Sequence, residues 1–540
     1  MSTFDAIIIG AGHNGLVCAT YLAKAGLKVA ALERRDVVGG PVVTEEVWPG
    51  YHISVAAFWM SLLQPKIMMD LDLRQHGIEV LTTPAGFQPF ADGSSLIFWP
   101  DIQRMADEIR KFSAADAEAY PRFIAHMEGL MPYLRRLLFE IPVDPTTGRL
   151  ADIGRALSLV WRFRDVGARF YDIWDLLTLS AYDFLRRWFE SETMLTALGC
   201  YASGSGGNIS PKTPGSAYVL ARPMLREPGT PAGPGGLVKG GMGAVTQAMR
   251  RAAEAAGVVI RTKAEVARVI IEEGTARGVT LRDGERIEAK VVIANANAQT
   301  TFLRLVDKAH LPTGFISAVK RIRTDSSCFK INLATDQLPR WSAYDARGVE
   351  AQNPGSITIA ENLDELEEAF EAARHGRIAP RPYLWILTPS AFDPTVAPAG
   401  KHVVSVFGGH VPYRLRDRDW DDAARGELYE IVMRQICRYA PGFGNSVIAK
   451  QILVPQDLER MFDLPGGHVH HGELSIDQIF FRRPVARCAD YRSPVARLYQ
   501  CGASTHPGGG VTGVPGHNAA RIVLQDLKKG VSPAILGWRV

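Results

Sequence analysis

Hydrophobic and polar positions near the N-terminus follow the pattern of a strand, a tight turn, a helix and a second strand. The mostly apolar run at residues 4–9 is typical of a strand buried on both faces of a parallel sheet. Residues 16–25 then predict a helix that stops near Gly26, and residues 28–32 predict a second strand. This order indicates a βαβ unit at the start of an α/β fold.

Three glycines lie in the turn between the first strand and the helix. Gly10, Gly12 and Gly15 form a GxGxxG pattern, and Glu33 follows the third glycine by 18 residues. In such a turn the first glycine permits the tight bend, the second lets the backbone approach a pyrophosphate, and the third allows close helix packing. Glu33 is placed to accept hydrogen bonds from a ribose. The pattern therefore predicts a dinucleotide site rather than a glycine-rich turn without a ligand.

The residues after Glu33 bear on which dinucleotide is bound. Gly39 and Gly40 follow at a spacing typical of FAD enzymes, and paired glycines let the chain pass close to the diphosphate. Arg34 and Arg35 leave open a 2′-phosphate partner, and hence NADP. The region near the C-terminus favours the flavin.

That region is a second glycine-rich segment. Residues 498–503 predict a strand ending in a turn of small residues, and five glycines then fall within the nine positions 508–516, before a helix. Backbone N–H groups in such a segment can crowd a planar or anionic ligand. This arrangement suits the edge of a flavin ring and its ribityl diphosphate.

In the middle of the chain, a segment without regular structure is predicted first, and a helix and strands follow it. Residues 222–236 are rich in proline and glycine and predict a loop or linker. Residues 244–256 predict a helix, 258–261 a strand, and 266–293 an antiparallel meander. In a flavin domain this meander would bring the backbone of Val266 to the adenine end.

Length and composition limit the architectures that the chain can adopt. The 540 residues, 46% apolar and 22% charged, have ordinary globular composition and are too many for one simple core. We predict an α/β fold: a Rossmann-like FAD-binding domain of the glutathione-reductase/amine-oxidase type with a discontinuous α+β substrate domain. The FAD-binding domain is expected at residues 1–85, 235–300 and 490–540, and the substrate domain at residues 86–234 and 301–489.

Charge and cysteine content narrow the partners. A formal net charge of +4, from 61 basic and 57 acidic residues, gives no case for nucleic acid. The six cysteines form no CxxC pair, which argues against a redox dithiol and suits a reducing compartment. We find no signal or transit peptide and no apolar run of about 18 residues. We therefore expect a cytoplasmic protein, with peripheral contact at a membrane surface as an open alternative.

Residues 149–189 interleave aromatic and aliphatic side chains with arginines. A basic, aromatic helical segment of this kind can rest on a membrane. The same pattern fits a helix whose apolar face packs on the core and whose arginines are solvated. We favour the core-facing interpretation.

Five motifs are spread along the chain: IIIGAGHNGL, ERRDVVGG, TEEVWPGY, GGMGAVTQAM and YQCGASTHPGGGVTGVPGHNAA. Together they resemble the phytoene-desaturase-like FAD oxidoreductases, and in particular the subgroup called pyridine nucleotide-disulfide oxidoreductase domain-containing protein 2. The resemblance implies bound FAD, held at Gly10, Gly12, Gly15, Glu33, Arg34, Gly39, Gly40, Val266, Gly502, Gly510 and Val511. Pro41 departs from the pattern, because many relatives have arginine there. Despite the subgroup's name, the flavin is expected to be the redox centre.

Candidate pocket residues come from two polar segments. Tyr51 and His52 follow a Pro-Gly turn, and His471 and Glu473 lie in the segment GGHVHHGE at 466–473. Histidines at this density can bind a metal. Because the adjacent histidines face differently and no cysteine is near, we expect no metal site. These residues are candidates for substrate contact, and structural hydrogen bonding is the alternative.

These observations predict an FAD-dependent dehydrogenase or desaturase that removes a hydride from a hydrophobic, isoprenoid or lipid-like small molecule. Its electrons would pass to oxygen or a quinone, and an apolar pocket should lie between the two domains. The alternatives are a flavin amine oxidase and a flavin-bearing regulatory or interaction protein with little turnover. Amine oxidation predicts an aromatic cage and a lysine near the flavin.

Overall fold

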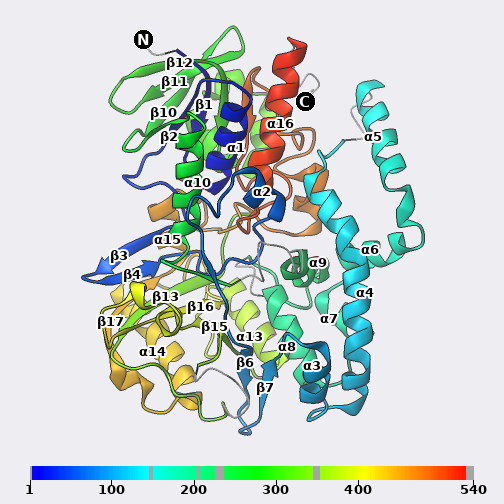
Figure 1. Ribbon diagram of the computed structural model, residues 1–540, viewed down its shortest axis with the longest axis vertical. Helices are drawn as coiled ribbons and strands as arrows, with labels where there is room; N and C mark the ends of the chain where they lie inside the picture. The colour runs from blue at the N-terminus through cyan, green and yellow to red at the C-terminus, as the bar shows by residue number, and fades with distance from the viewer. Residues whose placement is uncertain (1–2, 145–149, 204–206, 226–235, 345–352, 531–540) are drawn as a thin grey trace.

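Two seven-stranded sheets organise the chain, one toward each end of the molecule in Figure 1. The computed structural model describes residues 3–144, 150–203, 207–225, 236–344 and 353–530. The predicted α/β fold is confirmed.

The first sheet has the order β10-β11-β12-β1-β2-β9, and β18 pairs with β12. Its strands are β1 (Thr3–Ile9), β2 (Val29–Leu32), β9 (Val259–Arg261), β10 (Val266–Glu272), β11 (Thr275–Leu281), β12 (Arg286–Ala294) and β18 (Leu498–Gln500). The pairs around β1, together with β2–β9 and β12–β18, are parallel, whereas β10, β11 and β12 form an antiparallel meander. The carboxyl ends of the parallel strands therefore meet at one edge, where ligands bind in open α/β sheets.

Strand β1 is buried on both faces. Ala6 and Ile8 pack with α1 (His13–Lys24), α10 (Gly243–Ala255) and α16 (Val514–Lys529), whereas Ile7 and Ile9 belong to the core on the opposite face. Helix α1 contacts both α10 and α16, and Figure 1 shows it between them. The expected strand, turn, helix and strand are all present, but the helix begins at His13, three residues before the predicted start.

The second sheet has the order β17-β13-β16-β15-β14-β6-β7. Its strands are β6 (Gly86–Pro89), β7 (Ser95–Phe98), β13 (Cys328–Thr335), β14 (Ser356–Ile359), β15 (Tyr383–Leu387), β16 (His402–Gly409) and β17 (Val447–Leu453). One face packs on α14 (Asp422–Tyr439). The opposite face carries Trp385 and Phe407 toward a cavity between the two sheets.

Helices complete the walls of that cavity. The long α4 (Ala114–Phe139), α8 (Glu192–Ser203) and α9 (Ser216–Ala221) share one apolar core. Shorter helices are α2 (Pro65–Asp70), α3 (Ile102–Ile109), α7 (Ala181–Leu185), α11 (Ala298–Thr300), α12 (Thr313–Lys320), α13 (Leu363–Arg374) and α15 (Pro455–Phe462). Strands β3 (Thr44–Trp48) and β4 (Tyr51–Ser54) form a hairpin, and the distant strands β5 (Val80–Leu81) and β8 (Leu237–Val238) pair antiparallel. No helix within the described ranges is both long and apolar enough to cross a bilayer.

Helices α5 (Leu150–Arg162) and α6 (Arg169–Thr178) lie on the outer side of α4 in Figure 1. The expectation that their apolar residues face the core is wrong for most of them: Leu157, Val160, Trp161 and Tyr171 are 64–73% exposed. Arg162, Arg164 and Arg169 are exposed as well, and the Arg164 guanidinium covers the Trp161 ring, 4.0 Å from its centroid.

The predicted linker at 222–236 is also partly wrong. Arg222–Leu225 forms a single 3₁₀ turn that continues directly from α9, and Gly236 pairs with Met60. Pro223 begins a helical turn without penalty, because its missing N–H would have no partner there. Positions 226–235 lie outside the described residues. The domain boundaries given above stay a prediction.

Candidate functional site

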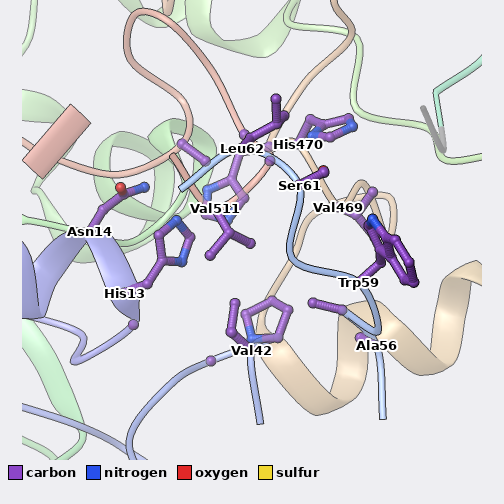
Figure 2. Close-up of a pocket in the computed structure, with 18 of the residues that line it drawn as sticks. His13, Asn14, Val42, Ala56, Trp59, Ser61, Leu62, Val469, His470 and Val511 are labelled. Carbon is purple, nitrogen blue, oxygen red and sulfur yellow. The ribbon is translucent and has the colours of Figure 1, made fainter. Parts of the chain in front are cut away.

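A cavity of about 1420 Å³ extends from the GxGxxG turn to the inner face of the second sheet. Figure 2 shows His13 and Asn14 on one side of it and Trp59 and Val469 on the other, with Val511 between them. Its lining comes from segments that are far apart in sequence. This volume exceeds that of most small-molecule pockets and is large enough for a dinucleotide and a second molecule.

At one end, the turn from β1 into α1 forms a backbone cradle. Gly10 and Gly12 line the cavity, and Gly10 has a φ of +92°, which favours glycine. A Cβ on Gly12 would lie 2.9 Å from Asn295 Nδ2, so a larger residue would intrude. Because α1 begins at His13, its free N–H groups and positive dipole end lie at the cavity, where they favour a phosphate.

Three of the predicted cofactor glycines support this cradle by close packing. Gly15, Gly39 and Gly502 are not among the described residues that line the cavity. A Cβ on Gly15 would lie 2.2 Å from Gly10 O, and one on Gly502 would lie 2.4 Å from Asn295 O. Gly39, at φ +124°, donates its N–H to Ala11 O at 2.9 Å.

Glu33 directly follows the second strand, β2, and lines the cavity. Its Oε2 accepts from Ala11 N and its Oε1 from Arg35 N, each at 3.0 Å. Burial raises the pKa of the Glu33 carboxyl, while these two hydrogen bonds oppose the rise. Each oxygen keeps a lone pair that can accept from a ribose hydroxyl.

Arg34, Gly40 and Val266 also line this end. The Arg34 guanidinium donates to Met461 O at 2.6 Å, and Val266 begins β10.

The C-terminal segment lines the cavity with Gly509, Gly510 and Val511. Gly510 has a φ of +108°, and a Cβ there would lie 2.7 Å from Leu62 Cδ1. Val511 has a φ of +61°, which strains a β-branched residue. Such strain persists where the surrounding structure imposes it, and it gathers at ligand sites. Helix α16 begins three residues later, at Val514.

Histidines line the space between the two glycine segments. Burial lowers the pKa of His13 to about 4 and that of His471 to about 3, so both are neutral at pH 7. His13 Nε2 and His471 Nδ1 are buried and have no hydrogen-bond partner among the described residues. Buried polar atoms are normally hydrogen-bonded, so these atoms indicate a ligand surface.

Three of the four predicted pocket residues lie elsewhere. Tyr51, His52 and Glu473 are not among the described residues that line the cavity. Tyr51 packs in a small core and His52 is exposed on β4, because the β3–β4 hairpin turns away from the cavity. Glu473 is buried and forms an ion pair with Arg323, whose Nε lies 2.7 Å from Glu473 Oε2. Of the four, only His471 lines the cavity.

The segment 466–473 does not gather metal ligands. Within the described parts of the chain, no group of three or more His, Cys, Asp or Glu side chains is arranged to hold a metal ion. The rings of His468 and His470 are 6.1 Å apart.

The other end of the cavity has mostly apolar walls. Its residues on α4, α8 and α9 are Tyr120, Phe123, Ile124, Met127, Met131, Leu198, Tyr201, Val219 and Leu220. We call this part the apolar chamber.

Aromatic rings close the chamber against the second sheet. Phe58 stacks on Phe407 at a centroid distance of 5.3 Å and meets Trp385 edge-on at 5.6 Å. Lys330, which is 1% exposed, places its Nζ 4.7 Å from the Phe58 centroid and donates to Asn332 Oδ1 at 2.9 Å. Burial lowers the pKa of Lys330 to about 7.

Sequence reasoning missed Lys330, Arg222 and the walls of the chamber. Both cations interrupt apolar runs, YVLARPML and CFKINLAT. That interruption is a usable signal, because Lys and Arg are almost never fully buried without a partner.

The residues at the first end fit a dinucleotide with a flavin ring. The glycine cradle leaves room for the close approach of a pyrophosphate, and the unpartnered nitrogen atoms of His13 and His471 belong to residues that line the same cavity. The family model for flavin containing amine oxidoreductases matches residues 15–524. The chain belongs to this family. Its cofactor is FAD, as predicted, and it has the fold of an oxidoreductase.

Similar proteins support the subgroup that the motifs predicted. The chain is 41% identical to pyridine nucleotide-disulfide oxidoreductase domain-containing protein 2 of Rattus norvegicus, covering 97% of this chain and 94% of the relative. It is 28% identical to a limonene dehydrogenase polypeptide of Castellaniella defragrans (97% and 95%) and 26% identical to the lycopene-forming phytoene desaturase of Pseudescherichia vulneris (97% and 99%). The predicted resemblance is thereby confirmed.

Solved structures share the fold at low identity. An oxidoreductase from Methanosarcina mazei matches with a TM-score of 0.61 at 17% identity, covering 96% of this chain and all of the other. A putrescine oxidase bound to putrescine matches with a TM-score of 0.60 at 16% identity, covering 98% and 99%.

Proposed function

We propose that this FAD-dependent oxidoreductase is a dehydrogenase or desaturase that removes a hydride from a hydrophobic, isoprenoid or lipid-like small molecule. The observation that carries the proposal is the apolar chamber, which continues without a break into the space between the glycine segments. Burying an apolar molecule there would contribute about 25 cal/mol per Å² of apolar surface. The relatives named for limonene and phytoene are in keeping with such a substrate.

The same proposal assigns the cofactor contacts. Gly10, Gly12 and the N-terminus of α1 would hold the pyrophosphate, Glu33 the ribose, and Gly510 and Val511 the edge of the flavin ring. Of the other predicted residues, Arg34, Gly40 and Val266 line the cavity. Gly15, Gly39 and Gly502 pack closely behind this lining. Bound FAD supplies a two-electron acceptor.

The chain's own task is then orientation and exclusion of water. The walls of the apolar chamber would hold one C–H bond of the substrate against the ring, and the aromatic rings of Phe58, Trp385 and Phe407 would keep water away from it. His13 and His471, neutral at pH 7, offer nitrogen atoms that can accept a proton. The electrons would leave to oxygen or a quinone.

An amine oxidase is the second candidate, and one feature favours it. The aromatic cluster around Trp385, with the buried Lys330 beside Phe58, supplies the aromatic residues and the lysine that amine oxidation predicts. Arg222 argues against it, because this cation lines the same cavity and would repel an ammonium group.

Anaerobic mixing of the holoprotein with candidate reductants separates these functions. We expect acyclic isoprenoids to bleach the flavin absorption band, and putrescine, NADH and NADPH to leave it largely unchanged. Nicotinamide nucleotides should fail because the chain has one full dinucleotide fingerprint, the GxGxxG pattern at 10–15 with Glu33 after the following strand, and no CxxC pair. Bleaching by putrescine alone would establish the amine oxidase instead. FAD that none of these compounds reduces would favour a regulatory protein.

We further propose that the protein works in the cytoplasm and contacts a bilayer through α5 and α6. The patch consists of Ile153, Leu157, Val160, Trp161, Phe170, Tyr171 and Trp174, each 45–73% exposed. Helix α6 packs against α4 and α9, which line the apolar chamber, so the patch lies on the outer side of the chamber wall. All six cysteines are free, which suits a reducing compartment.

Sedimentation with phosphatidylcholine vesicles tests this contact. Residues 150–178 carry equal numbers of basic and acidic side chains, so apolar burial rather than charge should drive binding. Replacing Trp161 and Trp174 by Ser should weaken it about tenfold or more, since burying a large apolar side chain contributes about 1.5–3 kcal/mol. Phe481→Ser, at a residue 46% exposed outside the patch, is the control. A wild-type protein that forms dimers and ignores vesicles would assign the patch to a second copy of the chain.

A further inference from the structure

Arg222 is a cation buried in the cavity wall. It is 6% exposed, belongs to the 3₁₀ turn after α9, and lines the cavity between the apolar chamber and the C-terminal glycine segment. Its Nη2 donates to Gly509 O and would lie 2.9 Å from a Cβ on Gly510. The guanidinium therefore lies where the substrate space meets the proposed flavin edge.

No described carboxylate forms an ion pair with Arg222. The carboxylates among the described lining residues are Glu33, Glu128, Glu265, Glu459 and Asp463. Glu33 accepts from two backbone N–H groups, Glu265 pairs with Arg282 at 3.0 Å, and Asp463 pairs with Arg304. Glu459 accepts from the Tyr413 hydroxyl, and Glu128 is exposed. An isolated buried charge is costly, and no described carboxylate offsets this one, so a bound anion would stabilise Arg222.

The groups around Arg222 do not supply that partner. Arg483 is a second buried cation nearby, and its N–H groups are taken up by backbone carbonyl oxygens, among them Ala503 O and Glu473 O. Tyr218 is buried with them, and burial raises the pKa of its hydroxyl, which keeps it neutral. Two buried cations without an acidic partner among the described residues make this part of the cavity electropositive. Of the two, Arg222 is the one that lines the cavity.

We propose that Arg222 anchors a carboxylate group on an otherwise apolar substrate held in the apolar chamber. A planar guanidinium can bind a carboxylate through two parallel hydrogen bonds, which fixes the orientation of the ligand as well as its position. Val219, Leu220 and Met224, which flank Arg222 in sequence, line the cavity beside it and would contact the apolar part of the same molecule. The inference rests on the proposed function and narrows its substrate to an apolar acid.

Ligand titrations of the FAD-loaded protein test this proposal. The probes are decanoate, decan-1-ol and decylamine at pH 7.5, which share a ten-carbon chain and differ in the charge of the head group. Perturbation of the flavin absorption spectrum gives the dissociation constant of each. We expect decanoate to bind about tenfold or more tightly than decan-1-ol, and decylamine to bind most weakly.

Variants assign the preference to Arg222. Arg222→Gln should reduce the ratio between decanoate and decan-1-ol to about twofold or less, and Arg222→Lys should keep a smaller preference for the acid. Arg304→Gln is the matched control, because this lining arginine already pairs with Asp463, and it should keep the wild-type ratio. Because both dissociation constants are measured on the same variant, their ratio does not change when the variant is merely less stable.

Three results would overturn the inference. Equal binding of decanoate and decan-1-ol by the wild type, or a ratio unchanged in Arg222→Gln, would show that Arg222 binds no carboxylate. A variant with a shifted flavin reduction potential and an unchanged ratio would assign the charge to the reduced cofactor. If none of the three probes binds while FAD is present, the apolar chamber is not a substrate site, and the proposed function fails together with the inference.

Discussion

Glu33 combines a structural and a proposed ligand role on one carboxylate. It holds the N–H groups of Ala11 and Arg35, and the proposal gives it the ribose as well. Glu33→Ala should weaken FAD binding by about 1.5–3 kcal/mol, the range for hydrogen bonds to a charged group. Titration of the apoprotein with FAD measures this loss. Glu285→Ala, at an exposed residue paired with Arg261, is the control, and an equal loss there would remove the special role of Glu33.

Buried histidines make stability depend on pH in a defined direction. Burial lowers the pKa of six of them to about 3 or 4: His13, His410, His468, His471, His506 and His517. In the unfolded chain a histidine takes up its proton near pH 6.5. The unfolded state thus binds more protons as the pH falls, so this part of the stability is complete above pH 6.5 and declines toward pH 4.

We therefore expect the thermal midpoint of the FAD-loaded protein to fall steadily between pH 7 and pH 4.5. Calorimetry or near-ultraviolet circular dichroism measures it. A midpoint that stays constant or rises over this interval would show that the histidines are not held neutral by burial.

Residue-scale prediction from sequence succeeded where backbone geometry dictates residue type. The GxGxxG glycines could be placed because a tight turn and a close approach leave few other choices. Tyr51 and His52 could not, since a hairpin that turns away from the cavity has the same sequence signature as one that lines it. Arg222 fell in a segment predicted as a linker, and a buried cation there is visible only once its surroundings are known.

At the scale of elements, the β1–α1 unit depends on one glycine contact that a matched variant can isolate. A methyl group on Gly15 would lie 2.2 Å from Gly10 O, which is backbone and cannot move aside without shifting the turn. Gly15→Ala should therefore lower both the thermal midpoint and FAD retention. Gly426→Ala in α14 meets nothing within 4 Å and should raise the free energy of unfolding by about 0.5–1 kcal/mol, with FAD content unchanged. A Gly15→Ala protein that behaves like the Gly426 variant would contradict the close packing of strand and helix.

The sequence predicted element positions best in the first sheet, because there the apolar runs and the glycine-rich turns mark the same strand ends. Helices α5 and α6 show the limit. Their apolar stripe predicts a helix correctly, but periodicity alone does not say whether the stripe meets the protein core or another surface. The structure leaves the stripe exposed, which reverses the interpretation favoured from sequence.

At the scale of the whole molecule, the cavity joins segments that no local pattern connects. The turn after β1, the walls from α4 to α9, the second sheet and the loop before α16 are separated by up to several hundred residues. Sequence motifs predicted the two cofactor segments and an apolar pocket between domains. The second sheet and the chamber walls depend on pairing between distant segments, such as β6 with β14. The sequence of either strand alone does not predict its partner.

The central claim is that one cavity holds FAD at its glycine-rich end and an apolar molecule in its chamber. Mass spectrometry of the ligands released from the purified protein tests it most directly. We predict FAD in a one-to-one ratio with the chain and, beside it, an apolar compound, carrying a carboxylate if Arg222 anchors it. FMN in place of FAD, a folded protein that cannot be loaded with FAD, or a polar amine as the second ligand would contradict the account.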